Sequence, residues 1–172
     1  GKIFEWIQPD LNNEKQGDWE PVTLLITPKK LQVFSFGAEY VFSQSSKLTA
    51  EFAMSIYDVN TFSSKNKSDN NGYAAKFNFL SDDKKIKIFG KPFILQSVAG
   101  FEYVAKSFKP LERLRNVEFL RDWSIPYETT GADEYLSNAS LRIADNTGNR
   151  LRYEITNYNH SADYNGFRHL IE

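Results

Sequence analysis

The sequence predicts an all-β fold, an antiparallel meander of about eight long strands that forms a barrel or a segment of one. Apolar and polar residues alternate with period two over long stretches, as in strands with one apolar and one polar face. The chain is also rich in aromatic residues, 15% of the total, and these favour strands. Its 172 residues suit one domain, so we expect a single antiparallel β domain over residues 1–172.

The alternation is clearest in Leu31–Phe62, which reads as two long strands joined by the polar turn Ser43–Ser46. One face of this hairpin is apolar and carries Phe34, Phe36, Ala38, Tyr40 and Phe42, then Leu48, Ala50, Phe52, Met54 and Ile56. The other face is polar or small and carries Ser35, Gly37 and Glu39, then Thr49, Glu51, Ala53, Ser55 and Tyr57. We expect the rest of the sheet to build on this hairpin.

Before the hairpin we expect an incoming strand or arm at 1–8 and a strand at 19–27, which Pro21 confines to an edge or an irregular entry. After it comes a polar loop at 63–72, closed by the turn signal Asn71-Gly72. The remaining first-half predictions are a strand at 73–80, a turn at 81–85, a brief strand at 86–89, a break at 90–92 and a long strand at 93–108.

Two segments allow both helix and strand. In 110–123, Pro110 suits the first turn of a helix and leucines recur every third residue, whereas alternation favours a strand over Asn116–Ile125, which we prefer. For 133–143 helix competes with a hairpin whose strands, 135–144 and 150–159, flank the turn 145–149. The polar tail then opens towards another strand.

Composition argues against several classes of protein. The chain has 21 basic and 22 acidic residues and a net charge of −1, which gives no reason to expect a nucleic-acid partner. Cysteine is absent, so disulfides and thiolate metal sites are impossible. No hydrolase, metalloprotease or nucleotide-binding motif occurs, and we expect no enzymatic activity. Because the chain begins at Gly1 rather than Met, we expect it to be a piece of a longer protein.

Alternation alone allows two environments. In a soluble sandwich or barrel the apolar face is internal, whereas in an outer-membrane barrel it meets lipid and the polar face lines the interior. Three features favour the membrane: strands longer than the ~5–6 residues typical of globular proteins, polar faces that mix small residues with isolated charges, and aromatics near strand ends. The isolated charges are Glu39, Glu51, Lys76, Glu102 and Arg152; the aromatics include Tyr40, Phe42, Tyr57, Phe62, Tyr73 and Tyr103.

Four runs resemble large β-barrel proteins of the outer membrane of Bacteroidetes: YDVNTFSS (57–64), GYAAKFNF (72–79), GFEYVAKSFKPLERLRNVEFLRDW (100–123) and GNRLRYEITNYN (148–159). The resemblance covers most of Leu24–Gly166. It implies one segment of such a barrel in the outer membrane of a Gram-negative bacterium, with membrane lipid and other strands of the parent chain as partners. It implies no catalytic residues.

An isolated barrel segment has a difficulty, because its sheet edges cannot be left unpaired in lipid. We therefore expect either further strands or self-association through open edges. The function that we expect is that of a non-enzymatic structural segment of a surface pore, transporter or assembly component. The alternative is a soluble secreted or periplasmic β-sandwich that binds a glycan or a partner protein.

The densest charge cluster is the candidate ligand site. It comprises Arg113, Arg115, Glu118, Arg121, Asp122 and Trp123. These residues suit structural ion pairs, or recognition of an anion or glycan with Trp123 as a stacking surface.

Metal sites have weaker support. His160 and His169 stand in a polar region, where we expect a solvated loop rather than a metal site. Asp69-Asn70 and Asp145-Asn146 offer oxygens for Ca²⁺, but the same residues suit ordinary turns. We expect no cofactor beyond that weak calcium possibility.

Overall fold

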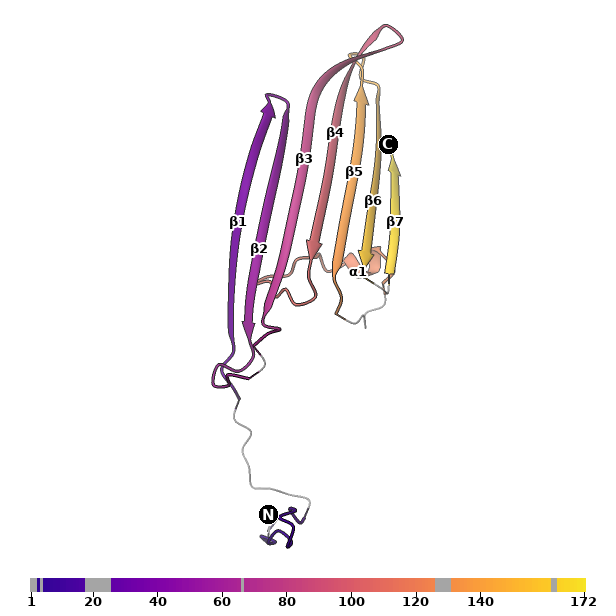
Figure 1. Cartoon of the computed structure of the whole chain (residues 1–172). Coiled ribbons are helices and arrows are strands. Elements are labelled where there is room, and N and C mark those ends of the chain that lie inside the picture. Colours follow the sequence, from indigo (N-terminus) through magenta and orange to yellow (C-terminus); the bar gives the residue numbers. More distant parts are fainter. Residues whose placement is uncertain (1–2, 4, 18–25, 66, 126–130, 162–163) are drawn as a thin grey trace.

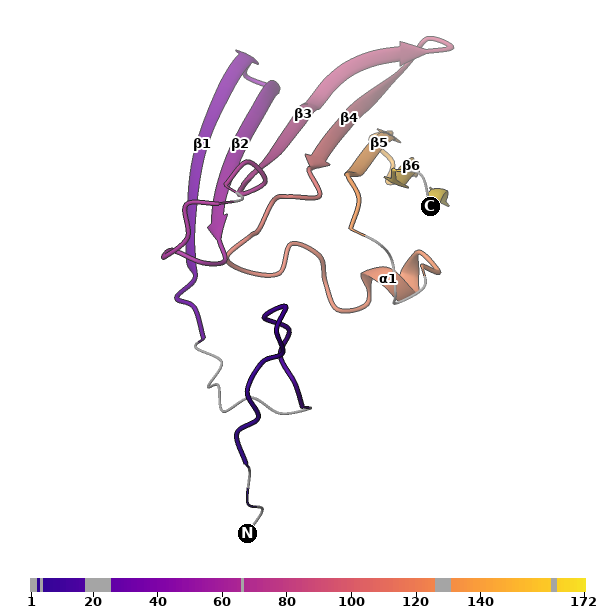
Figure 2. The same cartoon turned by 60° about the horizontal axis from the view of Figure 1, so that its bottom comes forward.

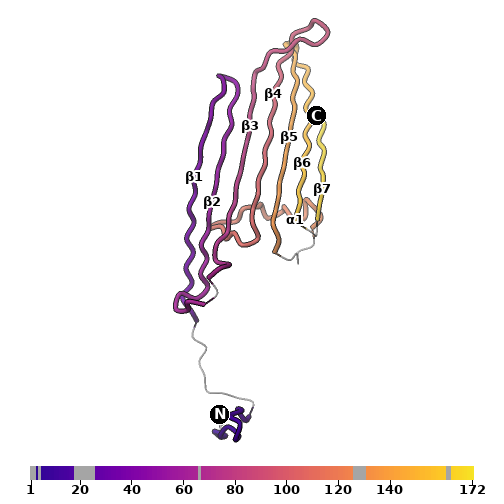
Figure 3. The backbone as a smooth tube through the Cα atoms, in the orientation of Figure 1, coloured from indigo at the N-terminus to yellow at the C-terminus, as the bar shows by residue number. Residues whose placement is uncertain are grey.

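A computed structural model describes residues 3, 5–17, 26–65, 67–125, 131–161 and 164–172. These residues form one sheet, with each strand paired to the next along the chain (Figures 1 and 3). The elements are β1 (Lys30–Ser43), β2 (Ser46–Asp58), β3 (Asn71–Ile88), β4 (Lys91–Val104), α1 (Phe119–Asp122), β5 (Glu134–Ala144), β6 (Arg150–His160) and β7 (Tyr164–Ile171).

The predicted all-β antiparallel meander is confirmed. All six neighbouring pairs are antiparallel, and the described strands number seven. The sheet is curved but does not close into a barrel (Figures 1 and 2). Within the described residues, β1 and β7 each pair on one side only.

The two ends of the sheet differ in their connections. Short turns join β1 to β2, β3 to β4 and β5 to β6 at the upper end of Figure 1. At the lower end, residues 59–70 join β2 to β3 and residues 105–133 join β4 to β5. The long connections are therefore gathered at one end.

The predicted alternation holds in the register, so the sheet has two distinct faces. The apolar face is followed from strand to strand through Phe36, Phe52, Ala75, Tyr103 and Tyr135, which pair in turn. The polar face is followed in the same way through Gly37, Glu51, Lys76 and Glu102. Every charge that the sequence analysis assigned to a polar face lies on this one.

The two faces differ in what covers them. On the apolar face large side chains remain exposed, among them Phe34 at 57%, Phe36 at 72%, Tyr40 at 64% and Phe42 at 58%. The buried apolar residues of the described chain are Val104, Phe108, Trp123, Ile125 and Tyr158. They lie where residues 105–125 cross the polar face (Figure 2). The small core is thus on the polar side of the sheet.

Both hairpins predicted from turn signals are confirmed. Ser43 and Ser46 close the turn between β1 and β2, and residues 145–149 separate β5 from β6. The helix alternative for 133–143 is wrong, because β5 is hydrogen-bonded on both sides, to β4 and to β6. The polar tail forms β7, as expected.

The strand predicted at Asn116–Ile125 is wrong. Phe119–Asp122 instead forms the single helical turn α1, in which Asp122 N–H donates to Glu118 O at 2.8 Å and Trp123 N–H to Phe119 O at 3.1 Å. These local bonds satisfy backbone groups that a strand would have to pair with a neighbour. The segment therefore crosses the sheet instead of joining it.

The turn predicted at 81–85 is also wrong, because β3 continues through it to Ile88. The register with β4 shifts between Ser81 and Lys84, and Asp83 has φ 52°. This is a β-bulge, which uses the same residue types as a turn. The brief strand predicted at 86–89 is the upper part of β3.

The remaining predictions concern the start of the chain. Most of the strand predicted at 19–27 lies outside the described residues. Of the first eight residues the structure describes 3 and 5–8, which form no strand.

Candidate functional site

We call residues 105–125 the strap, because this segment crosses the polar face at the end with the long connections (Figure 2). Its first anchor is at β2, where Lys109 N–H donates to the Ser55 hydroxyl at 2.9 Å. Ser55 is completely buried. Next to it, a Cβ on Gly72 would lie 2.3 Å from the Cα and the N of Phe108. Only a residue without a side chain allows this approach.

The second anchor is an aromatic cluster over β5, β6 and β7. Trp123, Ile125 and Tyr158 form its buried centre, and Phe119, Leu120, Leu136 and Tyr164 pack around it. The Tyr164 hydroxyl donates to Trp123 O at 2.6 Å. The guanidinium of Arg168 lies 5.5 Å from the Trp123 ring, within range for cation–π attraction. The cluster fixes the second half of the strap to the sheet.

Between the two anchors, Arg115 ties the strap to the strands by charge. It forms a short ion pair with Glu102 on β4 and contacts Glu134 Oε2 on β5 at 3.2 Å through both Nε and Nη2. The three side chains are at most 28% exposed. The three side chains form one half-buried group in which a single guanidinium binds both carboxylates, and Glu134 also interacts with the Tyr158 hydroxyl.

The predicted charge cluster therefore divides. Arg115 turns to the sheet, whereas Arg121 pairs on the surface with Glu118 at 2.6 Å and with Asp122 at 3.4 Å. Arg113 is exposed, and Trp123 is 6% exposed with Phe119 and Tyr158 against its ring. Ion pairs thus exist at both places, but the six residues do not line one site. Ligand binding by this cluster stays a prediction.

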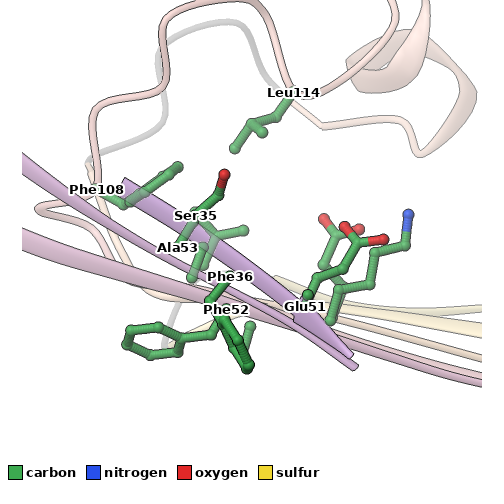
Figure 4. A pocket seen from close by; sticks show the side chains of 13 residues that line it. Ser35, Phe36, Glu51, Phe52, Ala53, Phe108 and Leu114 are labelled. Carbon is green, nitrogen blue, oxygen red and sulfur yellow. The ribbon is translucent and has the colours of Figure 1, made fainter. Parts of the chain in front are cut away.

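Between the strap and the sheet lies an open hollow of about 480 Å³. Figure 4 shows Phe108 and Leu114 on the same side of the strands as Ser35, Ala53 and Glu51. Phe36 and Phe52 point to the opposite side, although their backbones contribute to the floor. Lys76 and Glu102 complete the charged wall. A polar solute would meet small residues below, charges at one side and two apolar side chains above.

Charges of both signs continue up the polar face beyond the hollow. Lys47 pairs with Glu39 at 3.0 Å, and Arg152 pairs with Glu154 at 2.6 Å. In the register Lys76 lies between Glu51 and Glu102. Acidic and basic groups therefore alternate across this face rather than forming a region of one sign.

The expectation that both histidines stand in a solvated loop is wrong. His160 ends β6 and is 6% exposed, and His169 lies within β7 with its Nδ1 2.8 Å from the Tyr153 hydroxyl. In the strand register His160 lies opposite Glu134, on the polar face, and His169 lies opposite Ile155, on the apolar face. Being on opposite faces, the two imidazoles cannot converge on one ion.

The Asp145 turn uses its oxygens locally. Oδ1 accepts from the backbone N–H groups of Thr147 and Asn149, and Oδ2 accepts from the side chains of the same residues at 2.7 Å. The bonds from the Asn149 and Thr147 side chains hold the pKa of Asp145 well below its usual range. Asp69 is exposed in the connection before β3. Calcium at either place stays a prediction.

Ser55, Gly72, Phe108 and Tyr158 dock the strap, and none of the four was predicted from the sequence to do so. The one available signal was Gly72, whose absent side chain was taken as a sign of a turn.

Groups of three or more His, Asp or Glu that could hold a metal ion do not occur among the described residues. Nor does that part of the chain contain a helix long and apolar enough to cross a membrane. No protein-family model, curated protein or solved structure matches the chain.

Proposed function

We propose that this chain is a non-enzymatic segment of the wall of an outer-membrane β-barrel, with its apolar face towards lipid and its polar face towards the interior. One observation carries the proposal: the strap packs on the polar face and leaves the aromatic face uncovered. This is the reverse of a soluble sheet, whose aromatic face forms the core. The resemblance to outer-membrane barrels of Bacteroidetes agrees with it.

The accessible surface supports the same arrangement. It amounts to 13831 Å², whereas a compact soluble protein of this mass exposes about 8,700 Å². The exposed side chains include Phe34, Phe36, Tyr40 and Phe42 on the apolar face, and a continuous apolar surface of this kind marks a membrane or protein contact. The strands from β1 to β4 have 13 to 18 residues, enough to cross a bilayer core, for which ~9–11 residues suffice.

A second argument comes from the apolar band, by which we mean the part of the apolar face that carries aromatic and aliphatic side chains. The lower limit of this band lies at different heights on different strands. On β1 the lowest aromatic residue of the apolar face is Phe34, whereas on β6 the lowest apolar residue of that face is Ile155. Through the register Ile155 is level with Ala139, Ala99, Phe79, Leu48 and Tyr40. Between these two strands, Ile56 on β2 is level with Gln32 and Tyr135 on β5 is level with Phe36, so the band rises from position 34 to position 40 of β1 mainly in the step from β5 to β6.

The rise of the apolar band along the strands, divided by the distance across them, gives the angle at which the strands would tilt in a bilayer. With ~3.4 Å per residue and ~4.8 Å between strands, the slope corresponds to roughly 40° at β6. Phe167 on β7, level with Ala38 on β1, gives about 25° by the same arithmetic. Transmembrane strands tilt by ~35–45° from the membrane normal. A horizontal bilayer across tilted strands produces such a band.

The open edges suggest what completes the wall. β1 and β7 run in the same direction, since an even number of antiparallel steps separates them. A second copy in the same orientation would pair its β1 with β7 in parallel. An antiparallel barrel instead needs an odd number of further strands, and other strands of a longer barrel chain would provide them.

Adjacent positions on β3 test the proposal. Phe77 lies on the apolar face and Lys76 on the polar face, and the chain contains no cysteine. Phe77→Cys and Lys76→Cys would be introduced singly into the full-length protein and labelled in isolated outer membranes with an environment-sensitive maleimide. We expect nitroxide-bearing lipids to quench the label at position 77 and an aqueous quencher to act at position 76.

The experiment also separates the alternative. In a soluble β-sandwich a second protein layer would cover the apolar face, the protein would be recovered from the periplasm or medium, and neither label would respond to lipid-bound quenchers. That result would overturn the assignment to a membrane.

A further inference from the structure

We propose that the strap is the constriction of a passage for small polar solutes along the polar face, and that Arg115 holds it in place. The inference rests on the proposed function, because only in a closed barrel does the polar face enclose a passage. It adds what narrows that passage and which residues set its width.

The strap is placed across the passage rather than beside it. It contacts six consecutive strands through Ser55 on β2, Gly72 on β3, Glu102 on β4, Glu134 on β5, Tyr158 on β6 and Tyr164 on β7. A solute moving parallel to the strands must therefore pass the strap. Figure 2 shows this segment crossing beneath the sheet at its lower end.

The space that remains has the size and lining for a small hydrated molecule. The hollow of about 480 Å³ is bounded above by Phe108 and Leu114 and below by small residues such as Ala53 and Ala74. Its charged wall presents Glu51, Lys76 and Glu102. Mixed charge with a narrow apolar roof suits small polar solutes of either sign and excludes large ones.

Different contacts attach the two halves and the middle of the strap to the sheet. The first half is anchored by the backbone bond to Ser55, and the second half by the aromatic cluster around Trp123. Between them, Leu114 stands over the hollow and the adjacent Arg115 bridges to Glu102 and Glu134. Without this guanidinium the two carboxylates would repel each other, and the middle of the strap would lose its link to β4 and β5.

The test compares two arginines of the strap. The full-length protein would be reconstituted in planar lipid bilayers as wild type, Arg115→Met and Arg121→Met. Arg121 is the matched control, because its partners Glu118 and Asp122 belong to the strap itself. We expect Arg115→Met to raise the single-channel conductance by roughly two-fold or more, with added current noise, and Arg121→Met to leave the conductance unchanged.

A second measurement does not depend on the folding of the Arg115 variant. Leu114→Cys would be modified during recording with a charged thiol reagent, with Val59→Cys in the other long connection as control. Modification at 114 should change the conductance in discrete steps, and modification at 59 should not. If the protein does not insert into membranes, the proposed function fails. If it inserts but neither Arg115→Met nor modification at 114 alters or opens a current, the constriction is overturned.

Discussion

Gly72 is the single residue on which docking of the strap depends most directly. A Cβ at this position would lie 2.3 Å from the Cα and N of Phe108, which are backbone atoms and cannot rotate away. At Gly37, also on the polar face, the nearest atom to a Cβ is Glu51 Cγ at 3.7 Å, an ordinary contact. The two glycines therefore offer a matched pair.

We expect Gly72→Ala to displace the first half of the strap and to lower the free energy of unfolding by about 1–3 kcal/mol, the usual cost of overpacking. Gly37→Ala should be close to neutral. Limited trypsin digestion measures the displacement, because Arg113 and Arg115 offer cleavage sites within the strap, and urea unfolding in detergent micelles gives the stability. Equal resistance of both variants to trypsin would show that the strap tolerates a side chain at position 72.

The turn between β3 and β4 shows a residue type at odds with its local conformation. Ile88 pairs with Lys91, so the loop consists of Phe89 and Gly90 alone. Their φ angles are 50° and 79°, and a two-residue hairpin loop with two positive φ values favours Asn-Gly. Phe89 is fully exposed, so its side chain gains nothing from packing in return.

Phe89→Asn should therefore stabilise this hairpin by about 1 kcal/mol, because Asn adopts the left-handed region at lower cost than Phe. Phe89→Val, with a β-branched side chain, should destabilise it. Amide hydrogen exchange at Ile88 and Lys91 reports on the hairpin directly. Faster exchange in the Asn variant than in wild type would mean that Phe89 contributes an interaction of its own.

At the scale of elements, the strands could be predicted because their signal is local. Period-two alternation in Leu31–Phe62 reports the two faces of a sheet without knowledge of any partner. The bulge in β3 was mistaken for a turn because Asp82 and Asp83 suit both, and only the continued pairing of Lys84 with Leu95 distinguishes them.

The strap could not be predicted in the same way, because what fixes it is distant in sequence. Trp123 packs on Tyr158 and accepts a hydrogen bond from Tyr164. Arg115 forms ion pairs with Glu102 and Glu134, although Glu118 is nearer in sequence. Spacing within 110–123 allows both helix and strand, and the alternation that favoured a strand contains no information about those partners. The prediction therefore located the charged residues that form ion pairs, but it wrongly grouped them into one site.

At the scale of the whole molecule, the strand register predicts how deep each residue of the apolar face lies in a bilayer. Residues that pair across the strands form a row, and in tilted strands the members of one row lie at different depths. Phe36 and Asn159 lie on the same face and in the same row, connected by register through Phe52, Ala75, Tyr103 and Tyr135. Yet Phe36 lies within the apolar band, whereas Asn159 follows Asn157, whose side chain donates to Asn165 Oδ1 at 2.7 Å. If the strands cross a bilayer at an angle, one row must pass from lipid to water.

This relation predicts different depths for two residues that a level sheet would place alike. Nitroxide labels at Phe36→Cys and Asn159→Cys in the full-length protein, reconstituted in bilayers, would be compared by power-saturation spectroscopy with oxygen and a water-soluble nickel chelate. We expect position 36 to be accessible to oxygen and position 159 to nickel, because a tilt of roughly 25–40° separates them by about 10–15 Å along the membrane normal. Equal accessibility to both reagents at the two positions would mean that no bilayer cuts across this sheet. The apolar face would then require a protein partner rather than lipid, since aromatic side chains as exposed as Phe36 and Tyr40 need one or the other to cover them.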